Sequence, residues 1–178
     1  MKEPLKQISD LVERFERNID AYHSPAYNET QLRIEFVDPF FEALGWDVTN
    51  KAGYAEQYKD VIHEDAIKIA GASKAPDYCF RIGGVRKFFL ETKKPSIDIK
   101  SQTSPAYQLR RYAWSAKLPI SILTGFEETA IYDCRVRPKL TDNKDSMAFV
   151  VTDTLGKTFV SKPLKIRSIK KYLTTFSK

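Results

Sequence analysis

Residues 74–96 read KAPDYCFRIGGVRKFFLETKKPS, and the expected architecture follows from this stretch. Two runs rich in aromatic and β-branched residues, 77–82 and 86–92, flank the pair Gly83-Gly84. Such runs are typical of β-strands, and a Gly-Gly pair between two strands favours a two-residue turn. The stretch therefore predicts an antiparallel β-hairpin.

This hairpin would place two acids and one amine at the same end. Asp77 begins its first strand, and Glu91 and Lys93 lie near the end of its second. Side chains two residues apart on a strand point to the same face, so Glu91 and Lys93 project together, with Asp77 alongside. Burying two unpaired carboxylates is costly, and a divalent cation would offset that cost. Oxygen ligands favour Mg²⁺, with Mn²⁺ as a substitute; the plainer alternative is an exposed Glu–Lys pair beside an acid that only begins a strand.

Helical patterns precede the hairpin. Apolar residues recur at helical spacing over residues 5–19, and a second helix is expected over residues 29–44. Asn28 and Gln31 form a capping box at the start of this second helix, and Pro39 should kink it.

Strands and helices then alternate along the rest of the chain. One strand is expected over residues 61–69, before the hairpin, and a helix over residues 104–117, after it. Further strands are expected at ISILTG, ETAIYDC and MAFVVTD, followed by a basic helix from about Pro163. This order predicts the α/β class, with a mixed central β-sheet flanked by helices.

The charge is unevenly distributed over the 178 residues, whose net charge is +6. Residues 1–84 contain 10 Lys and Arg against 15 Asp and Glu, a net charge of −5, whereas residues 85–178 contain 19 against 8, a net charge of +11. A basic half is typical of proteins that bind a polyanion, and nucleic acid is the commonest one in the cytoplasm. Solubility alone explains the same charge equally well.

Several classes of protein are disfavoured by the sequence. No apolar run approaches the roughly 18 residues that a membrane span needs, and the N-terminal residues carry acids where a secretory signal is apolar. We therefore expect a cytoplasmic protein. Cys79 and Cys134 make neither a disulfide framework nor a zinc motif, and His23 and His63 are too scattered for a histidine metal cluster.

Pro76-Asp77, followed by Glu91-Thr92-Lys93 on the next strand, resembles the motif of the PD-(D/E)XK nuclease superfamily. The version here looks most like the N-terminal nuclease domains of type I and type IIG restriction enzymes. Those domains typically have a helix that ends in Leu-Gly-Trp, as residues 44–46 do here. They also carry a Gln and a Tyr four apart on the helix after the motif, as in Gln108 and Tyr112.

The resemblance covers about residues 28–133 and implies a restriction-endonuclease-like core of order αβββαβ. It implies that Asp77 and Glu91 hold Mg²⁺ and that Lys93 orients the attacking water or stabilises charge on the phosphorus. Glu35 matches the upstream glutamate of the family and would add a catalytic metal ligand. Gln108 matches the helix glutamine that lies beside the catalytic site.

Each of these secondary residues also has a plainer interpretation. On a helical wheel Glu35 shares a face with Asp38 and Glu42, which is typical both of a solvated face and of a stripe facing a cleft. Gln108 and Tyr112 would serve equally to cover the sheet.

Four residues are candidates for DNA contacts. They are Lys94, Arg110, Arg111 and Tyr112. The two arginines would either contact phosphates or form a solvated face. The basic C-terminal residues favour a solvated helix over a DNA clamp.

The sequence as a whole predicts one endonuclease domain over residues 1–178, with a nuclease core over about 28–133 and a C-terminal strand and basic helix over about 147–178. We expect double-stranded DNA as the substrate, and methyltransferase, specificity or motor modules on the same chain or on partner subunits. Dimerisation on DNA would allow a double-strand cut. The alternatives are a catalytically silent, nuclease-like DNA-binding module and a protein-interaction module, and RNA stays open as a substrate.

Overall fold

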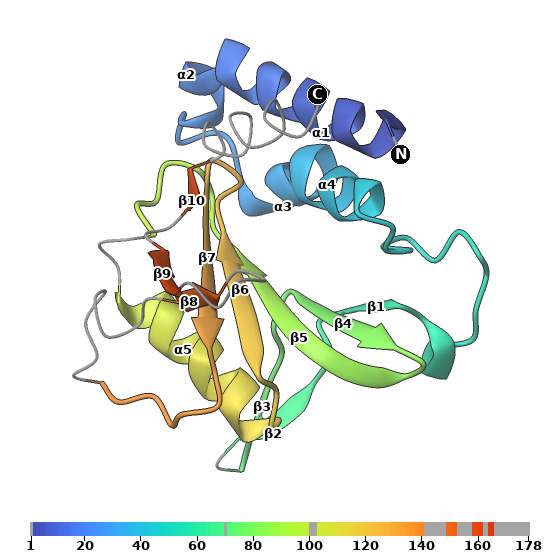
Figure 1. Cartoon of the computed structure of the whole chain (residues 1–178), viewed down its shortest axis with the longest axis vertical. Coiled ribbons are helices and arrows are strands. Elements are labelled where there is room, and N and C mark those ends of the chain that lie inside the picture. Colours follow the sequence, from blue (N-terminus) through green and yellow to red (C-terminus); the bar gives the residue numbers. More distant parts are fainter. Residues whose placement is uncertain are drawn as a thin grey trace.

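The computed structural model describes residues 2–69, 71–99, 103–140, 149–152, 158–161 and 164–165. A six-stranded sheet in the order β1-β4-β5-β6-β7-β10 forms its centre, with helices on both sides (Figure 1). The strands are β1 (Val61–His63), β4 (Tyr78–Ile82), β5 (Val85–Thr92), β6 (Ile120–Thr124), β7 (Glu128–Asp133) and β10 (Leu164–Lys165). Strands β5 and β6 are parallel and the other pairs are antiparallel. The expected α/β class with a mixed central sheet is confirmed.

The hairpin expected from the sequence is the pair β4–β5. Gly83 and Gly84 form its turn with φ values of 57° and 77°, the left-handed backbone that a two-residue hairpin turn requires. A Cβ at Gly84 would lie 2.8 Å from the carbonyl oxygen of Gln57, which belongs to the 3₁₀ turn Glu56–Tyr58. A larger residue at Gly84 would therefore both strain the turn and collide with this neighbouring segment.

Five helical segments precede the first strand and pack on one face of the central sheet. They are α1 (Lys2–Arg17), α2 (Ile19–Tyr22), α3 (Glu29–Leu32), the π-helical turn η1 (Arg33–Val37) and α4 (Asp38–Ala43). The capping box is confirmed, because the Asn28 side chain accepts from the Gln31 backbone and the Gln31 side chain accepts from the Asn28 backbone. This start fixes where the chain enters the helix that borders the candidate site.

The irregularity expected at Pro39 takes the form of the wide turn η1 just before it. An α-helix would pair the Glu35 carbonyl with the N–H of residue 39, and proline has none. The Arg14 guanidinium on α1 donates to this carbonyl instead, and it also lies 4.4 Å above the Phe36 ring. Helix α1 thereby fastens the segment that leads from α3 to α4.

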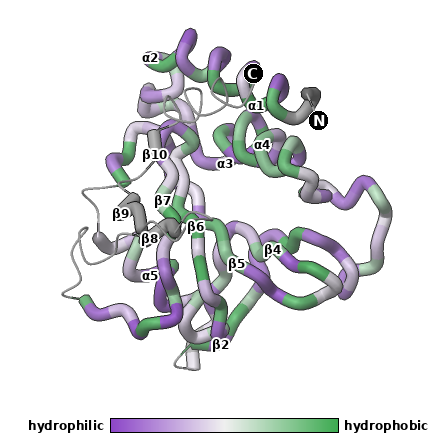
Figure 2. Tube along the Cα trace, viewed as in Figure 1, coloured by the Kyte–Doolittle hydropathy of each residue, from purple (hydrophilic) through white to green (hydrophobic). Residues whose placement is uncertain are grey.

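Two buried hydrophobic clusters lie on opposite faces of the sheet. Helices α1, α3 and α4 enclose the first cluster, which includes Phe80 and Leu90. Helix α5 (Thr103–Ser115) covers the second, which includes Phe89 and Leu109. Figure 2 shows the hydrophobic stretches of β5 and β6 between these helical layers. Fully burying a Phe or Leu side chain contributes about 1.5–3 kcal/mol, so adjacent residues of β5 anchor both layers.

Two sequence expectations about strands are wrong. The single strand expected over residues 61–69 is interrupted at Glu64, whose φ is 52°. The chain then forms β2 (Ile67–Ile69), which pairs with β3 (Ala72–Lys74) in a separate two-stranded sheet. The basic helix expected from about Pro163 does not begin there, because Leu164 and Lys165 pair antiparallel with β7. Residues 166–178 of that expected helix lie outside the described residues.

The strand expected at MAFVVTD is partly described. Its residues Phe149–Thr152 form β8, which pairs antiparallel with β9 (Thr158–Ser161). In the described residues, no helix is long and apolar enough to cross a membrane. Cys79 and Cys134 are buried free thiols.

Candidate active site

The register of the hairpin brings Asp77, Glu91 and Lys93 together. Tyr78 pairs with Leu90, so Asp77, which precedes β4, lies opposite Glu91. The Asp77 backbone N–H lies 3.4 Å from Glu91 Oε2, and Lys93 Nζ lies 3.2 Å from Glu91 Oε1. The three groups form one cluster, as the alternation of side chains along the strand predicts.

Asp77 is held in place by the residue between the other two. The Thr92 backbone N–H and hydroxyl donate to Asp77 Oδ2 at 2.7 and 2.6 Å, and Thr92 is fully buried. Among the described residues, the other oxygen, Oδ1, receives only a long contact of 3.4 Å from Arg33 Nη1. One carboxylate oxygen is therefore fixed by the protein, and the other retains capacity for a further partner.

The electrostatics of the cluster disfavour the charged form of Glu91. Burial, followed by the charge of Asp77, raises the pKa of Glu91, and the opposing effect of Lys93 is smaller. Burial lowers the pKa of Lys93, but the charges of Glu91, Glu29 and Asp77 outweigh it and the pKa lies above its ordinary value. Lys93 is therefore an ammonium at neutral pH, and the two carboxylates are incompletely neutralised.

The donor set fits a hard divalent ion. Among the described residues there is no group of three or more His, Cys, Asp or Glu side chains arranged to hold a metal. Mg²⁺ typically takes one or two carboxylates and completes its six positions with water and phosphate oxygens. Asp77 and Glu91 meet that requirement, and their mutual repulsion is what such an ion relieves.

Glu29, rather than Glu35, reaches this cluster from the helical side. Glu29 Oε1 lies 3.7 Å from Lys93 Nζ. The Glu35 carboxylate instead lies near Tyr27, whose pKa is raised by burial and then by the Glu35 charge. Neither Glu29 nor Arg33 was singled out from the sequence, although their spacing of four residues puts them on one helix face.

On α5, Gln108 and Tyr112 differ in burial. Tyr112 is buried, and burial followed by the charge of Glu91 raises its pKa. Tyr112 therefore lies within electrostatic range of Glu91. Gln108 is exposed, one helical turn earlier.

The candidate DNA-binding residues differ in accessibility. Arg110 is only 5% exposed and interacts electrostatically with Tyr132 and Cys134, so its place in the core does not support a phosphate contact. Arg111 is partly exposed and lies 5.9 Å from the Tyr107 ring centre. Lys94 is partly exposed directly after Lys93. Burial thus distinguishes Arg110 from Arg111 and Lys94, although the sequence makes all three candidates for DNA contacts.

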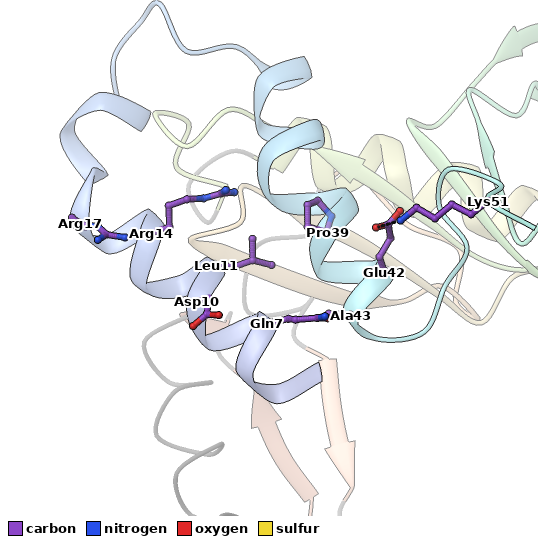
Figure 3. Close-up of a pocket in the computed structure, with 9 residues that line it drawn as sticks. All are labelled: Gln7, Asp10, Leu11, Arg14, Arg17, Pro39, Glu42, Ala43 and Lys51. Carbon is purple, nitrogen blue, oxygen red and sulfur yellow. Dashed lines mark hydrogen bonds and ion pairs between the residues drawn. The ribbon is translucent and has the colours of Figure 1, made fainter. Parts of the chain in front are cut away.

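A hollow lies away from these residues, between α1 and α4 (Figure 3). Its charged lining includes Arg14 and the ion pair of Lys51 with Glu42, whose atoms are 2.7 Å apart. None of Asp77, Glu91 and Lys93 lines it. This hollow is therefore separate from the candidate site.

The mixed sheet, the helices on both faces and the acidic cluster at the end of the hairpin define an α/β domain with a restriction-endonuclease-like core. Over 139 residues the chain is 49% identical to the type II restriction enzyme and methyltransferase RM.Eco57I of Escherichia coli. The match covers 77% of this chain and 14% of that protein. No family model matches the chain, and no solved structure gives a significant match.

Proposed function

We propose that the chain is the cleavage domain of a restriction-modification enzyme and hydrolyses DNA phosphodiester bonds with Mg²⁺. The observation that carries this proposal is the cluster at the end of one hairpin. The Asp77 backbone N–H and Lys93 Nζ lie 3.4 and 3.2 Å from the Glu91 carboxylate, and the Asp77 charge raises the pKa of Glu91. The similarity to a restriction enzyme and methyltransferase supports it independently.

Asp77 and Glu91 are the residues that would hold the ion. When bound there, Mg²⁺ would polarise the scissile phosphate and lower the pKa of an attacking water. Thr92 keeps Asp77 in position through two hydrogen bonds. Mn²⁺ is expected to substitute, because it accepts the same oxygen ligands.

Lys93 would act as a cation. Its raised pKa keeps it protonated at neutral pH, so it can donate to a phosphate oxygen or orient the attacking water, but it is a poor proton acceptor. Glu29 and Glu91 approach its ammonium group at 3.7 and 3.2 Å and would hold it toward the substrate. Glu35 and Gln108 stay candidates for supporting roles.

The matched segment is 14% of the length of a protein described as both restriction enzyme and methyltransferase. We propose that modification and target-recognition modules accompany this domain, on the same polypeptide or on partner subunits. Double-stranded DNA would be the substrate, and pairing of two such domains on DNA would produce a double-strand cut.

Nicking of supercoiled plasmid tests the function. The chain should nick plasmid with Mg²⁺ or Mn²⁺ and not with excess chelator. Removing a group that stabilises transition-state charge typically costs about 10²–10³ in rate, so Lys93→Ala should lose about that much. Lys87→Ala, an exposed position on the same strand, is the matched control. Nicking by Lys93→Ala at the parental rate, or nicking that ignores the chelator, would refute the proposal.

A further inference from the structure

A shallow groove opens beside the cluster, on the helical side. It is lined by residues 25, 27–30 and 33 and by Lys94. Two of its residues contact the cluster directly, since Glu29 lies 3.7 Å from Lys93 and Arg33 lies 3.4 Å from Asp77. The groove therefore continues from the site at which the phosphodiester bond would be cut.

Arg33 has hydrogen-bonding capacity to spare in this groove. A guanidinium has five N–H donors, and the contacts of Arg33 are long, at 3.4 Å to Asp77 Oδ1 and 3.4 Å to Thr30 Oγ1. Its side chain is 23% exposed. Arginine is suited to phosphate because its planar fork donates two parallel hydrogen bonds.

Lys94 supplies the second cation of the groove, from the end of the hairpin. Its side chain is partly exposed and makes no ion pair within the part of the chain that the structure describes. The acid of the groove, Glu29, is directed at Lys93. Arg33 and Lys94 therefore leave the groove with a surplus of positive charge.

We propose that this groove binds a phosphate of the DNA strand adjacent to the phosphate that is cleaved, with Arg33 and Lys94 as its two ligands. The inference rests on the proposed function, because it assumes that the strand passes over Lys93. A contact of this kind positions the strand without reading its sequence. Arg33 and Lys94 would thus set how the strand lies, while Asp77, Glu91 and Lys93 act on it.

Equilibrium binding of a short labelled DNA duplex in chelator tests the groove, because no cleavage is needed. Each phosphate contact contributes about 0.9 to the slope of log affinity against log salt concentration. Arg33→Gln and Lys94→Gln should each reduce this slope by about 1 and weaken duplexes of different sequence equally. Lys68→Gln, the same charge change at an exposed position of β2, should leave the slope unchanged.

Unchanged slopes for both groove variants, or affinity that ignores salt, would overturn the proposal. If Arg33→Gln lowers the melting temperature, Lys94→Gln decides the matter, since Lys94 makes no ion pair among the described residues. Plasmid nicking with Mg²⁺ is measured separately. Parental nicking with unchanged slopes defeats the groove alone, whereas reduced slopes without any nicking defeat the proposed hydrolysis and leave a DNA-binding groove.

Discussion

Replacing Arg14 by methionine should destabilise the protein by removing the partner of a helix carbonyl. The Arg14 guanidinium donates to the Glu35 carbonyl, which an α-helix would pair with the N–H that Pro39 lacks. A hydrogen bond from a charged group contributes about 1.5–3 kcal/mol. The contact of Arg14 with the Phe36 ring, at 4.4 Å, adds about 0.5–1 kcal/mol. The expected loss is about 2–4 kcal/mol in the free energy of unfolding.

A double-mutant cycle identifies the cause of this loss. Pro39→Ala supplies the missing N–H, so the Glu35 carbonyl gains a second source of hydrogen bonding. Arg14→Met should then cost about 1 kcal/mol less in the Pro39→Ala background than in the parent, within the range measured for residues that share a partner.

Urea denaturation followed by circular dichroism measures these free energies. Arg17→Met is the control, because Arg17 is exposed in the last turn of the same helix and such surface changes usually stay within about 0.5 kcal/mol. A loss below about 1 kcal/mol for Arg14→Met would show that the guanidinium does not serve the carbonyl. An equal loss in both backgrounds would show that Pro39 is not the reason.

Three further predictions concern the acidic cluster. Thr92→Val removes the hydroxyl that donates to Asp77 at 2.6 Å. The free energy of unfolding, measured by urea denaturation, should fall by about 1–3 kcal/mol, and Mg²⁺ binding measured by calorimetry should weaken. Unchanged values for both would contradict the role given to Thr92. Glu91→Gln should raise the melting temperature at pH 7 without divalent ions, because the raised pKa of Glu91 means that its charged form destabilises the fold. That gain should vanish as the pH falls below the ordinary value of 4.5, and a lower melting temperature at pH 7 would count against the repulsion. In plasmid nicking, Glu35→Gln should lose less activity than Glu91→Gln. Glu29→Gln should lose about tenfold, a loss equivalent to about 1.4 kcal/mol of transition-state stabilisation. Equal nicking rates for Glu29→Gln and Glu35→Gln would show that the contact of Glu29 with Lys93 is unimportant.

The hairpin and its cluster follow from local rules that the sequence displays directly. Side chains alternate along the strand, so Glu91 and Lys93 were expected to share a face. The Gly-Gly turn alone would put Asp77 opposite Leu90, and a register shift between Phe80 and Arg81 moves it opposite Glu91. The alternation and the turn act over a few residues and need no tertiary information, whereas the register shift was not predicted from the sequence. They account for the part of the site that could be predicted.

The helical side could not be predicted in the same way. A helical wheel assumes one angle per residue, whereas the π-helical turn Arg33–Val37 changes that angle in the middle of the segment. Glu35 lies inside this turn, so a helical wheel for a uniform helix does not describe its alignment with Asp38 and Glu42. Glu29 comes before the turn and contacts Lys93.

The burial of Arg110 could not be predicted from the sequence either. Arg110 and Arg111 are adjacent and chemically identical, yet the packing of α5 on the sheet leaves Arg110 only 5% exposed. The strand at Leu164–Lys165 was missed for a similar reason, since its pairing partner β7 lies more than thirty residues earlier in the chain. Both outcomes depend on contacts between segments that are distant in sequence.

The way in which each part of the site is anchored decides which part can move when a ligand binds. Asp77, Glu91 and Lys93 stand at the end of strands with hydrogen-bonded neighbours on both sides, so displacing them would split the sheet. Glu29 and Arg33 touch them only through side-chain contacts of 3.7 and 3.4 Å. The three residues are therefore fixed by the sheet, whereas Glu29 and Arg33 can adjust to a ligand by changing side-chain rotamers, without movement of the helical backbone that the core and Arg14 hold.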